Sequence, residues 1–135
     1  MAIQLSTTVR NARLDSFETA IGVSPILQLR TGSPPASCAA ADTGTLLASM
    51  TLPSDWMNAA SSGTKTKLGT WSDSSADATG TAGHFRIKDS TGATTHLQGT
   101  VTATGGGGDM TLSSTSITSG QVVAVDTFSI SEGNA

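Results

Sequence analysis

The sequence is short of aromatic and of charged residues. Aromatic residues make up 4% of its 135 residues, and tyrosine is absent. The core must therefore be built mainly from aliphatic side chains, and exposed aromatic platforms for binding a glycan are scarce. Charged residues reach 13%, against a usual value of about 25%, and serine, threonine and glycine supply most of the polarity. Because threonine favours strands while glycine and serine favour turns, this composition predicts many short strands.

The sequence also lacks the marks of several protein classes. Its formal net charge is −3, so the basic surface of a nucleic-acid-binding protein is missing. No apolar run is long enough to span a bilayer, and residues 1–10 lack the charged and apolar segments of a secretory signal. The single cysteine, Cys38, cannot form an intrachain disulfide. These absences predict a chain that folds in a reducing cytoplasm and has neither nucleic acid nor a membrane as partner.

The clearest positive pattern is a β-hairpin over residues 81–104. Apolar and polar residues alternate before and after a turn that contains Gly92, which is the pattern of two antiparallel strands. A three-residue loop with Gly92 at positive φ predicts the register. In this register Phe85 faces Leu97, and Ile87 faces Thr95. One face of the hairpin is then apolar and buried, and the other is polar and wet.

The polar face of the hairpin carries both histidines of the chain, His84 and His96. We expect them to be diagonal neighbours on the surface, but neither strand supplies a Cys, Asp or Glu that would complete a tetrahedral metal site. Asp73 and Asp77 share a loop that lacks the ligand spacing of calcium motifs. The sequence therefore predicts neither a metal nor a cofactor.

Residues 6–21 form the one good helical segment. Ser6 is a suitable N-cap and Gly22 a suitable C′ residue. The expected apolar stripe consists of Val9, Ala12, Phe17, Ala20 and Ile21. The stripe is broad because Leu14 lies to one side of it, so the helix either caps its own domain or also contacts another subunit. The charged residues expected on a solvated face are Arg10, Arg13, Asp15 and Glu18.

The remaining apolar segments predict a single all-β domain over residues 1–135. About seven strands with short turns favour an antiparallel β-sandwich or jelly roll with one N-terminal helix. The lysines of the strand at 64–71 indicate a sheet edge, and a short helical turn is expected near residues 54–60. The last strand is apolar on both faces, which predicts burial on both sides. The expected strands are 26–31, 45–52, 64–71, the two strands of the hairpin, 110–117 and 122–130.

This domain divides into an arm and helix (1–22), a sandwich (23–130) and a tail expected to fray (131–135). No catalytic constellation is evident within it. Serines are abundant, but no G-x-S-x-G motif is present. The glycine run at 105–108 lacks the Lys-Ser/Thr ending of a phosphate-binding loop. Cys38 lies among alanines, which is more typical of an inert thiol, so we expect that the protein is not an enzyme.

Two interpretations of the tryptophans remain open. Trp56 and Trp71 border loops, where they either seal the ends of the core or anchor a partner, since tryptophan is enriched at interfaces. The N-terminal segment offers a second contact element, because its apolar residues alternate like an added strand. The candidate interface residues are Ile3, Leu5, Trp56, Met57 and Trp71.

Several stretches together resemble small structural proteins of tailed bacteriophages. They are MAIQLSTTVRNARLDSFETAIG with SPILQLRTG, then LPSDWM, DSSADATGTAGHFRIKDSTG and GTVTATGGGG. The resemblance covers most of the chain and is closest to capsid decoration, or cement, proteins. It implies a small β-sandwich or jelly roll on the outside of the phage head, made in the host bacterial cytoplasm, with the major capsid protein as its partner.

A small domain gains little from one contact, so we expect a homodimer or homotrimer, in which linked copies hold one another at high effective concentration. With few charges available, cohesion should come from apolar patches and backbone pairing. The alternative function is a tail or fibre component that binds a host receptor or a glycan.

Overall fold

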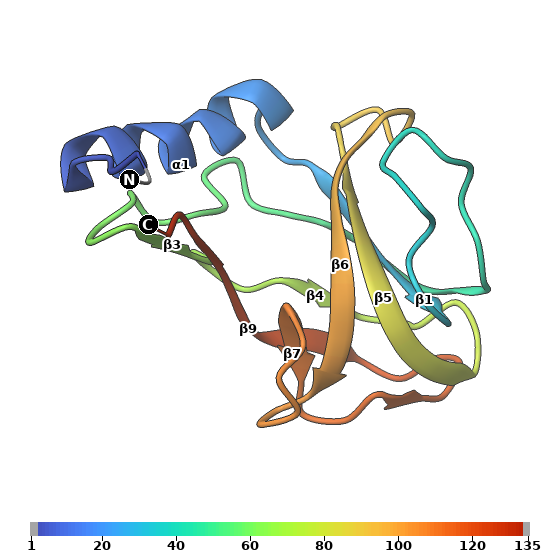
Figure 1. Ribbon diagram of the computed structural model, residues 1–135. Coiled ribbons are helices and arrows are strands. Elements are labelled where there is room, and N and C mark those ends of the chain that lie inside the picture. The colour runs from blue at the N-terminus through green and yellow to red at the C-terminus, as the bar shows by residue number, and fades with distance from the viewer. Residues whose placement is uncertain (1–2, 134–135) are drawn as a thin grey trace.

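The computed structural model describes residues 3–133 (Figure 1). In this part of the chain one helix, α1 (Thr7–Ile21), precedes nine strands that form a curled, mixed sheet. The strands are β1 (Ile26–Thr31), β2 (Leu46–Thr51), β3 (Thr64–Thr66), β4 (Ser72–Asp73), β5 (Gly80–Lys88), β6 (Thr95–Ala103), β7 (Met110–Leu112), β8 (Ser116–Ile117) and β9 (Val123–Ser131). The protein is therefore mostly β with one N-terminal helix, as the sequence predicts.

The strand order in the sheet is β2-β1-β5-β6-β7-β9-β3, with β4 paired to β9 and β8 paired to β5. The expectation of a purely antiparallel sheet is wrong, because β7 runs parallel to β6. The glycine run explains this geometry. Gly105 and Gly107 both have positive φ, which glycine adopts without strain, and the Gly108 N–H donates to Thr102 Oγ1 at 3.0 Å. The chain thus folds back along β6 within a few residues.

The core lies between two walls of the curled sheet, one formed by β1, β5 and β6 and the other by β9 with β3 and β4 (Figure 1). A chain of aromatic rings connects the walls. The ring centroids of Trp56 and Trp71 are 6.0 Å apart, and Phe128 lies 5.5 Å from both Trp71 and Phe85. Edge-to-face and tilted contacts at these distances are favourable.

Helix α1 begins and ends as the sequence predicts. Ser6 is its N-cap, and the Ser6 hydroxyl accepts a hydrogen bond from the Val9 N–H at 3.3 Å. Gly22 ends the helix with φ of 92° and donates its N–H to the Glu18 carbonyl. No helix among residues 3–133 is long and apolar enough to cross a membrane.

The β5–β6 hairpin is confirmed, but its register differs from the expected one by two residues. Ile87 lies opposite Leu97. The loop closes through a hydrogen bond from the Asp89 N–H to the Thr94 carbonyl, which makes it one residue longer than expected. A bulge at His96, between the pairs Ile87–Leu97 and Lys88–Thr95, accounts for the second residue of the register shift. Because side chains alternate with a period of two, the shift of two residues keeps Leu97 and the residues after it on their expected face. Before the bulge the shift is one residue, so Thr95 lies opposite Lys88 and not opposite Ile87 as expected.

Three local expectations are wrong. No helical turn forms near residues 54–60; there the chain bends at residues 54–55, and Met57 forms a bridge to Lys67. The segment 110–117 divides into β7 and β8. The last strand, β9, is buried on one face only, with Val123, Val125 and Phe128 inward. Its other face is open because no layer of this small domain covers it.

The tail expected to fray is tied at its start. Ser131 ends β9, and the Glu132 N–H donates to the Gly63 carbonyl at 2.9 Å. Residues 134–135 of that tail, and residues 1–2 of the N-terminal arm, lie outside the described residues.

Candidate binding surfaces

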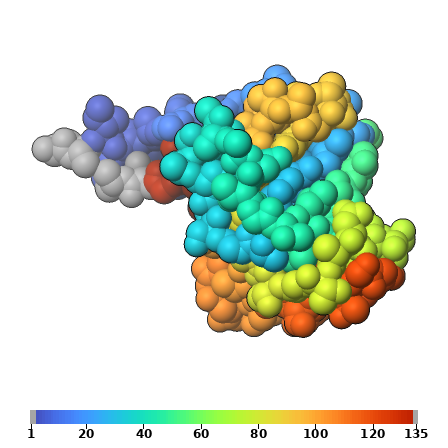
Figure 2. Space-filling view, turned by 90° about the vertical axis from the view of Figure 1, so that its right-hand side faces the viewer, coloured from blue at the N-terminus to red at the C-terminus, as the bar shows by residue number. Residues whose placement is uncertain are grey.

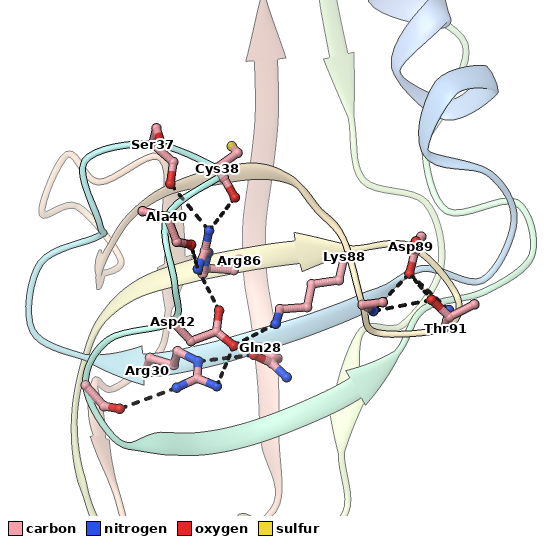
Figure 3. Close-up of polar contacts among 12 residues, drawn as sticks. Gln28, Arg30, Ser37, Cys38, Ala40, Asp42, Arg86, Lys88, Asp89 and Thr91 are labelled. Atoms are coloured by element: carbon pink, nitrogen blue, oxygen red, sulfur yellow. Dashed lines mark hydrogen bonds and ion pairs between the residues drawn. The ribbon is translucent and has the colours of Figure 1, made fainter.

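The face of β5 that was expected to be wet is covered. His84, Arg86 and Lys88 are all buried. The connection between β1 and β2 folds over Arg86 and Lys88 (Figure 3), and the Gly32 carbonyl of the same connection contacts His84. We call residues 33–43 of this connection the covering loop. The loop is rich in small residues and proline, so it has few side chains of its own to bury and offers its backbone carbonyls instead.

Arg86 is held almost entirely by the covering loop. Its Nη1 donates to the Ala40 carbonyl at 3.0 Å and to Asp42 Oδ1 at 2.6 Å. Its Nη2 donates to the Cys38 carbonyl at 2.8 Å and to the Ser37 carbonyl at 3.4 Å. A planar guanidinium suits several acceptors fixed in one plane. Arg86 thus orders the loop, and the loop in turn removes Arg86 from water.

Three cations converge on the carboxylate of Asp42 (Figure 3). Asp42 accepts from Arg86 at 2.6 Å, from Lys88 at 2.7 Å and from Arg30 at 3.2 Å. Burial by itself would raise the pKa of Asp42, but the hydrogen bond from Lys88 and the attraction of Arg30, Lys88 and Arg86 outweigh it. These contacts hold the pKa of Asp42 below its ordinary value of 3.8. We call these four residues the Asp42 cluster.

Another buried cation, Lys65, holds the helix against the body. Lys65 is 1% exposed, and its Nζ contacts Asp15 Oδ1 at 2.8 Å, Glu18 Oε2 at 2.7 Å and the Asn58 carbonyl at 2.8 Å. The hydrogen bond from Lys65 holds the pKa of Asp15 below its ordinary value of 3.8. The lysines of this strand were expected at an exposed edge. The strand is at the sheet edge, but Lys65 points under the helix.

Asp15 and Glu18 of helix α1 therefore contact the body, which reverses the orientation expected for them, whereas Arg13 stays exposed as expected. The Glu18 and Asp15 carboxylates accept the backbone N–H groups of Met57 and Ala60, and Asn11 accepts that of Gly63. These N–H groups belong to residues 57–63, which lie outside the named strands. Backbone N–H groups that are removed from water need hydrogen-bond acceptors. The side-chain oxygens of the polar helix residues supply those acceptors at this contact. Leu14 and Ile21 are the only buried apolar residues of α1.

Apolar side chains consequently remain on the outside of the N-terminal segment. Ile3 is 84% exposed, Val23 66% and Val9 45%; Ala12 and Ala20 are also exposed. Helical periodicity places Val9, Ala12 and Ala20 on the side of α1 opposite Leu14. In Figure 2 the first turns of the helix extend beyond the side of the body. We call these five residues the N-terminal apolar surface.

The structure separates the candidate interface residues into two groups. Ile3 is exposed and Leu5 is half-buried. Trp56, Met57 and Trp71 are 1–2% exposed, and both indole N–H groups donate inward, to the carbonyls of Gly22 and Leu68. Of the two interpretations, the burial of these three side chains fits the one in which they complete the monomer's own core.

The residues weighed for metal binding lie apart. His84 is fully buried, with Nδ1 2.9 Å from the Gly32 carbonyl, and pairs with Thr100. His96 is exposed at the bulge, so the two histidines are not neighbours. Asp73 accepts from the Ser49 and Ser75 N–H groups. Among residues 3–133, no three His, Cys, Asp or Glu side chains gather as a metal site would require.

Sequence reasoning did not identify the Asp42 cluster or the Lys65 contacts. One signal for the cluster was present: Arg86 and Lys88 lie at alternate positions of a central strand, and Arg30 occupies the neighbouring strand. Nothing local indicated that Asp42, in a loop far from the hairpin, would reach them. No protein-family model matches the chain, and no curated protein or solved structure matches it either.

The lowered pKa values of Asp15 and Asp42 predict loss of stability in acid. Because Asp15 and Asp42 have folded-state pKa values below 3.8, the unfolded chain binds more protons as the pH falls past that value. Their contribution is present above about pH 4 and is lost as the pH drops through the folded-state pKa values. Urea unfolding followed by tryptophan fluorescence should show a falling midpoint between pH 4 and pH 2. A midpoint that stays constant over this interval would contradict the expectation.

Proposed function

We propose that this protein is a structural protein of a tailed-phage virion, a capsid decoration or cement protein that binds the outside of the head and stabilises it. The likeness of its sequence stretches to such proteins supports the choice of the head. The observation that carries the proposed contact is the N-terminal apolar surface. In this proposal the curled mixed sheet serves as the compact β domain for which a sandwich or jelly roll was expected.

The N-terminal apolar surface has the chemistry of a docking element. Three of the four large apolar side chains most exposed among residues 3–133 belong to it, namely Ile3, Val9 and Val23; the fourth is Val122. Burying a valine or isoleucine side chain contributes roughly 1.5–3 kcal/mol. The helix presents these apolar groups outward while its carboxylates, Asp15 and Glu18, contact the body, and Arg13 is the exposed charge beside them. The proposed partner is the major capsid protein.

The proposal includes self-association. A single small apolar contact is weak, and a typical specific interface buries about 1,600 Å² in total. Two or three linked copies hold one another near the shell at high effective concentration, so that modest contacts add up to tight binding. We therefore propose a homodimer or homotrimer that binds across the joints between capsid subunits.

Replacing Val9 by glutamate should weaken binding to heads without harming the fold. Val9 is the third residue of α1, and a glutamate there would form a capping box with Ser6 and interact favourably with the helix dipole. The same change puts a charge into the proposed contact. We expect at least about a tenfold loss of affinity, equivalent to about 1.4 kcal/mol, and a larger loss when Ile3→Asp is added. Co-sedimentation with heads prepared without the protein measures both effects.

The matched control is Val122→Glu, because Val122 is as exposed as Val23 but lies next to the end of β9 that pairs with β4, away from the end that pairs with β3 near the helix. This control should bind heads like the parent. If the Ile3→Asp, Val9→Glu double variant also binds like the parent, the assigned contact surface is wrong. If the parent neither binds heads nor raises their resistance to heat, the decoration function is wrong, and labelling of intact particles should then place the protein on tails.

A further inference from the structure

A hollow of about 540 Å³ lies beside the Asp42 cluster. One wall is the covering loop at residues 38–42, and the other is the start of β6 with the end of its turn, residues 93–95. Arg86 and Lys88 also line it. Both of these cations are more than nine-tenths buried, so they reach the hollow from within the fold instead of extending across the surface. The alanines of the covering loop leave the space between the walls open.

The charges of the cluster are not balanced. Arg30, Arg86 and Lys88 share one carboxylate, that of Asp42, which leaves a formal charge of +2. Among residues 3–133, no second acidic side chain forms an ion pair with any of the three. Buried charge is costly unless it is paired. The neutral carbonyls of the loop satisfy hydrogen bonds but do not neutralise this excess.

Donor groups are also unused at the hollow. An ammonium has three N–H donors, and among the described residues Lys88 Nζ donates to one acceptor, Asp42 Oδ2 at 2.7 Å. Arg86 Nε also has no hydrogen-bond partner among the described residues, although this atom itself is closed off from solvent. The Thr94 and Thr95 residues on the opposite wall add hydroxyl groups. Unused donors and excess positive charge in one concave place favour the same class of ligand.

We propose that this hollow binds an oxyanion group, a carboxylate or a phosphate, against the Lys88 ammonium and the Arg86 guanidinium. Charge-assisted hydrogen bonds to such groups are about twice as strong as neutral ones. The hollow far exceeds the roughly 30 Å³ that one water molecule occupies in the liquid, so the molecule that carries the anion also fits. This inference does not depend on the capsid function, because it rests only on the charges and donors of the Asp42 cluster.

The test is titration of the protein with inorganic phosphate and with a blocked Gly-Glu-Gly tripeptide, at constant ionic strength set by sodium chloride. The Gly-Gln-Gly tripeptide is the matched neutral ligand. We expect a saturable rise in melting temperature of several degrees, with a dissociation constant of about 1 mM or lower, and no response to the glutamine peptide. A response to phosphate alone identifies a phosphate site, and one to the glutamate peptide alone identifies a carboxylate site.

Lys88→Met should weaken this binding at least about tenfold, because it removes the ammonium and keeps the length of the side chain. Lys67→Met is the matched control, since Lys67 lies on the other wall of the sheet and donates to the Gly69 carbonyl. If Lys88→Met does not fold, NMR titration of the parent protein still tests whether the anion binds in the hollow. The resonances of Arg86 Nε–H and of the amides of residues 38–42 should shift on titration, while the amide resonances of α1 should not change.

Two results would overturn the proposal. One is the lack of any saturable response to both anionic ligands at constant ionic strength. The other is a folded Lys88→Met variant that responds like the parent, with NMR shifts spread over the surface and not confined to the hollow.

Discussion

Trp71→Ala should lower the free energy of unfolding by about 4 kcal/mol, within the range for truncating a buried tryptophan. Trp71 is 1% exposed and forms the middle of the aromatic chain, with Trp56 at 6.0 Å and Phe128 at 5.5 Å. Its removal takes ring contacts from both neighbours and leaves a cavity between the two walls of the sheet. The indole hydrogen bond to the Leu68 carbonyl is lost as well, so a partly buried acceptor loses its donor.

Urea unfolding followed by far-ultraviolet circular dichroism measures this loss, since the signal does not depend on the tryptophan. The matched variant is Trp71→Phe, which keeps a ring in the stack and should lose less than half as much. A loss below about 1 kcal/mol for Trp71→Ala, the size typical of surface changes, would contradict the core assignment. It would also restore Trp71 as a candidate partner anchor.

Asp42→Asn is expected to cost about 3 kcal/mol, near the lower end of the range for breaking a buried ion pair. The asparagine keeps the shape of the side chain but leaves Arg30, Arg86 and Lys88 without a counter-charge. The lower end applies because 28% of the Asp42 side chain is exposed, so water moderates the loss. The covering loop should become the least stable part of the molecule, because Asp42 is its one charged link to β1 and β5.

Hydrogen exchange monitors this effect directly. Protection of the β5 amides, which lie beneath the covering loop, should fall in Asp42→Asn, and the urea midpoint should fall with it. Asp77→Asn is the control, because Asp77 is an exposed carboxylate in another loop. A parental midpoint in Asp42→Asn would show that the three cations do not need this carboxylate. In that case the loop carbonyls would be sufficient to hold Arg86.

The sequence by itself determined the elements with strong local signals. Ser6 and Gly22 mark the helix ends because a hydroxyl cap and a positive φ are local requirements. The alternation around Gly92 determined the hairpin and which side chains share a face. The strand at residues 26–31 follows from the same alternation, and its predicted bounds match those of β1.

Tertiary structure alone decided which of those faces is covered. Alternation reports that His84, Arg86 and Lys88 point the same way, but a loop more than forty residues earlier in the chain decides that they are buried. In the same way, helical periodicity places Asp15 and Glu18 on the same side of α1. That side faces the body only because the buried Lys65 and nearby backbone N–H groups bind the two carboxylates. A polar side chain can be buried wherever distant charges and carbonyls satisfy it. Such partners are set by the folded chain, because no local pattern of residues specifies which distant groups will meet.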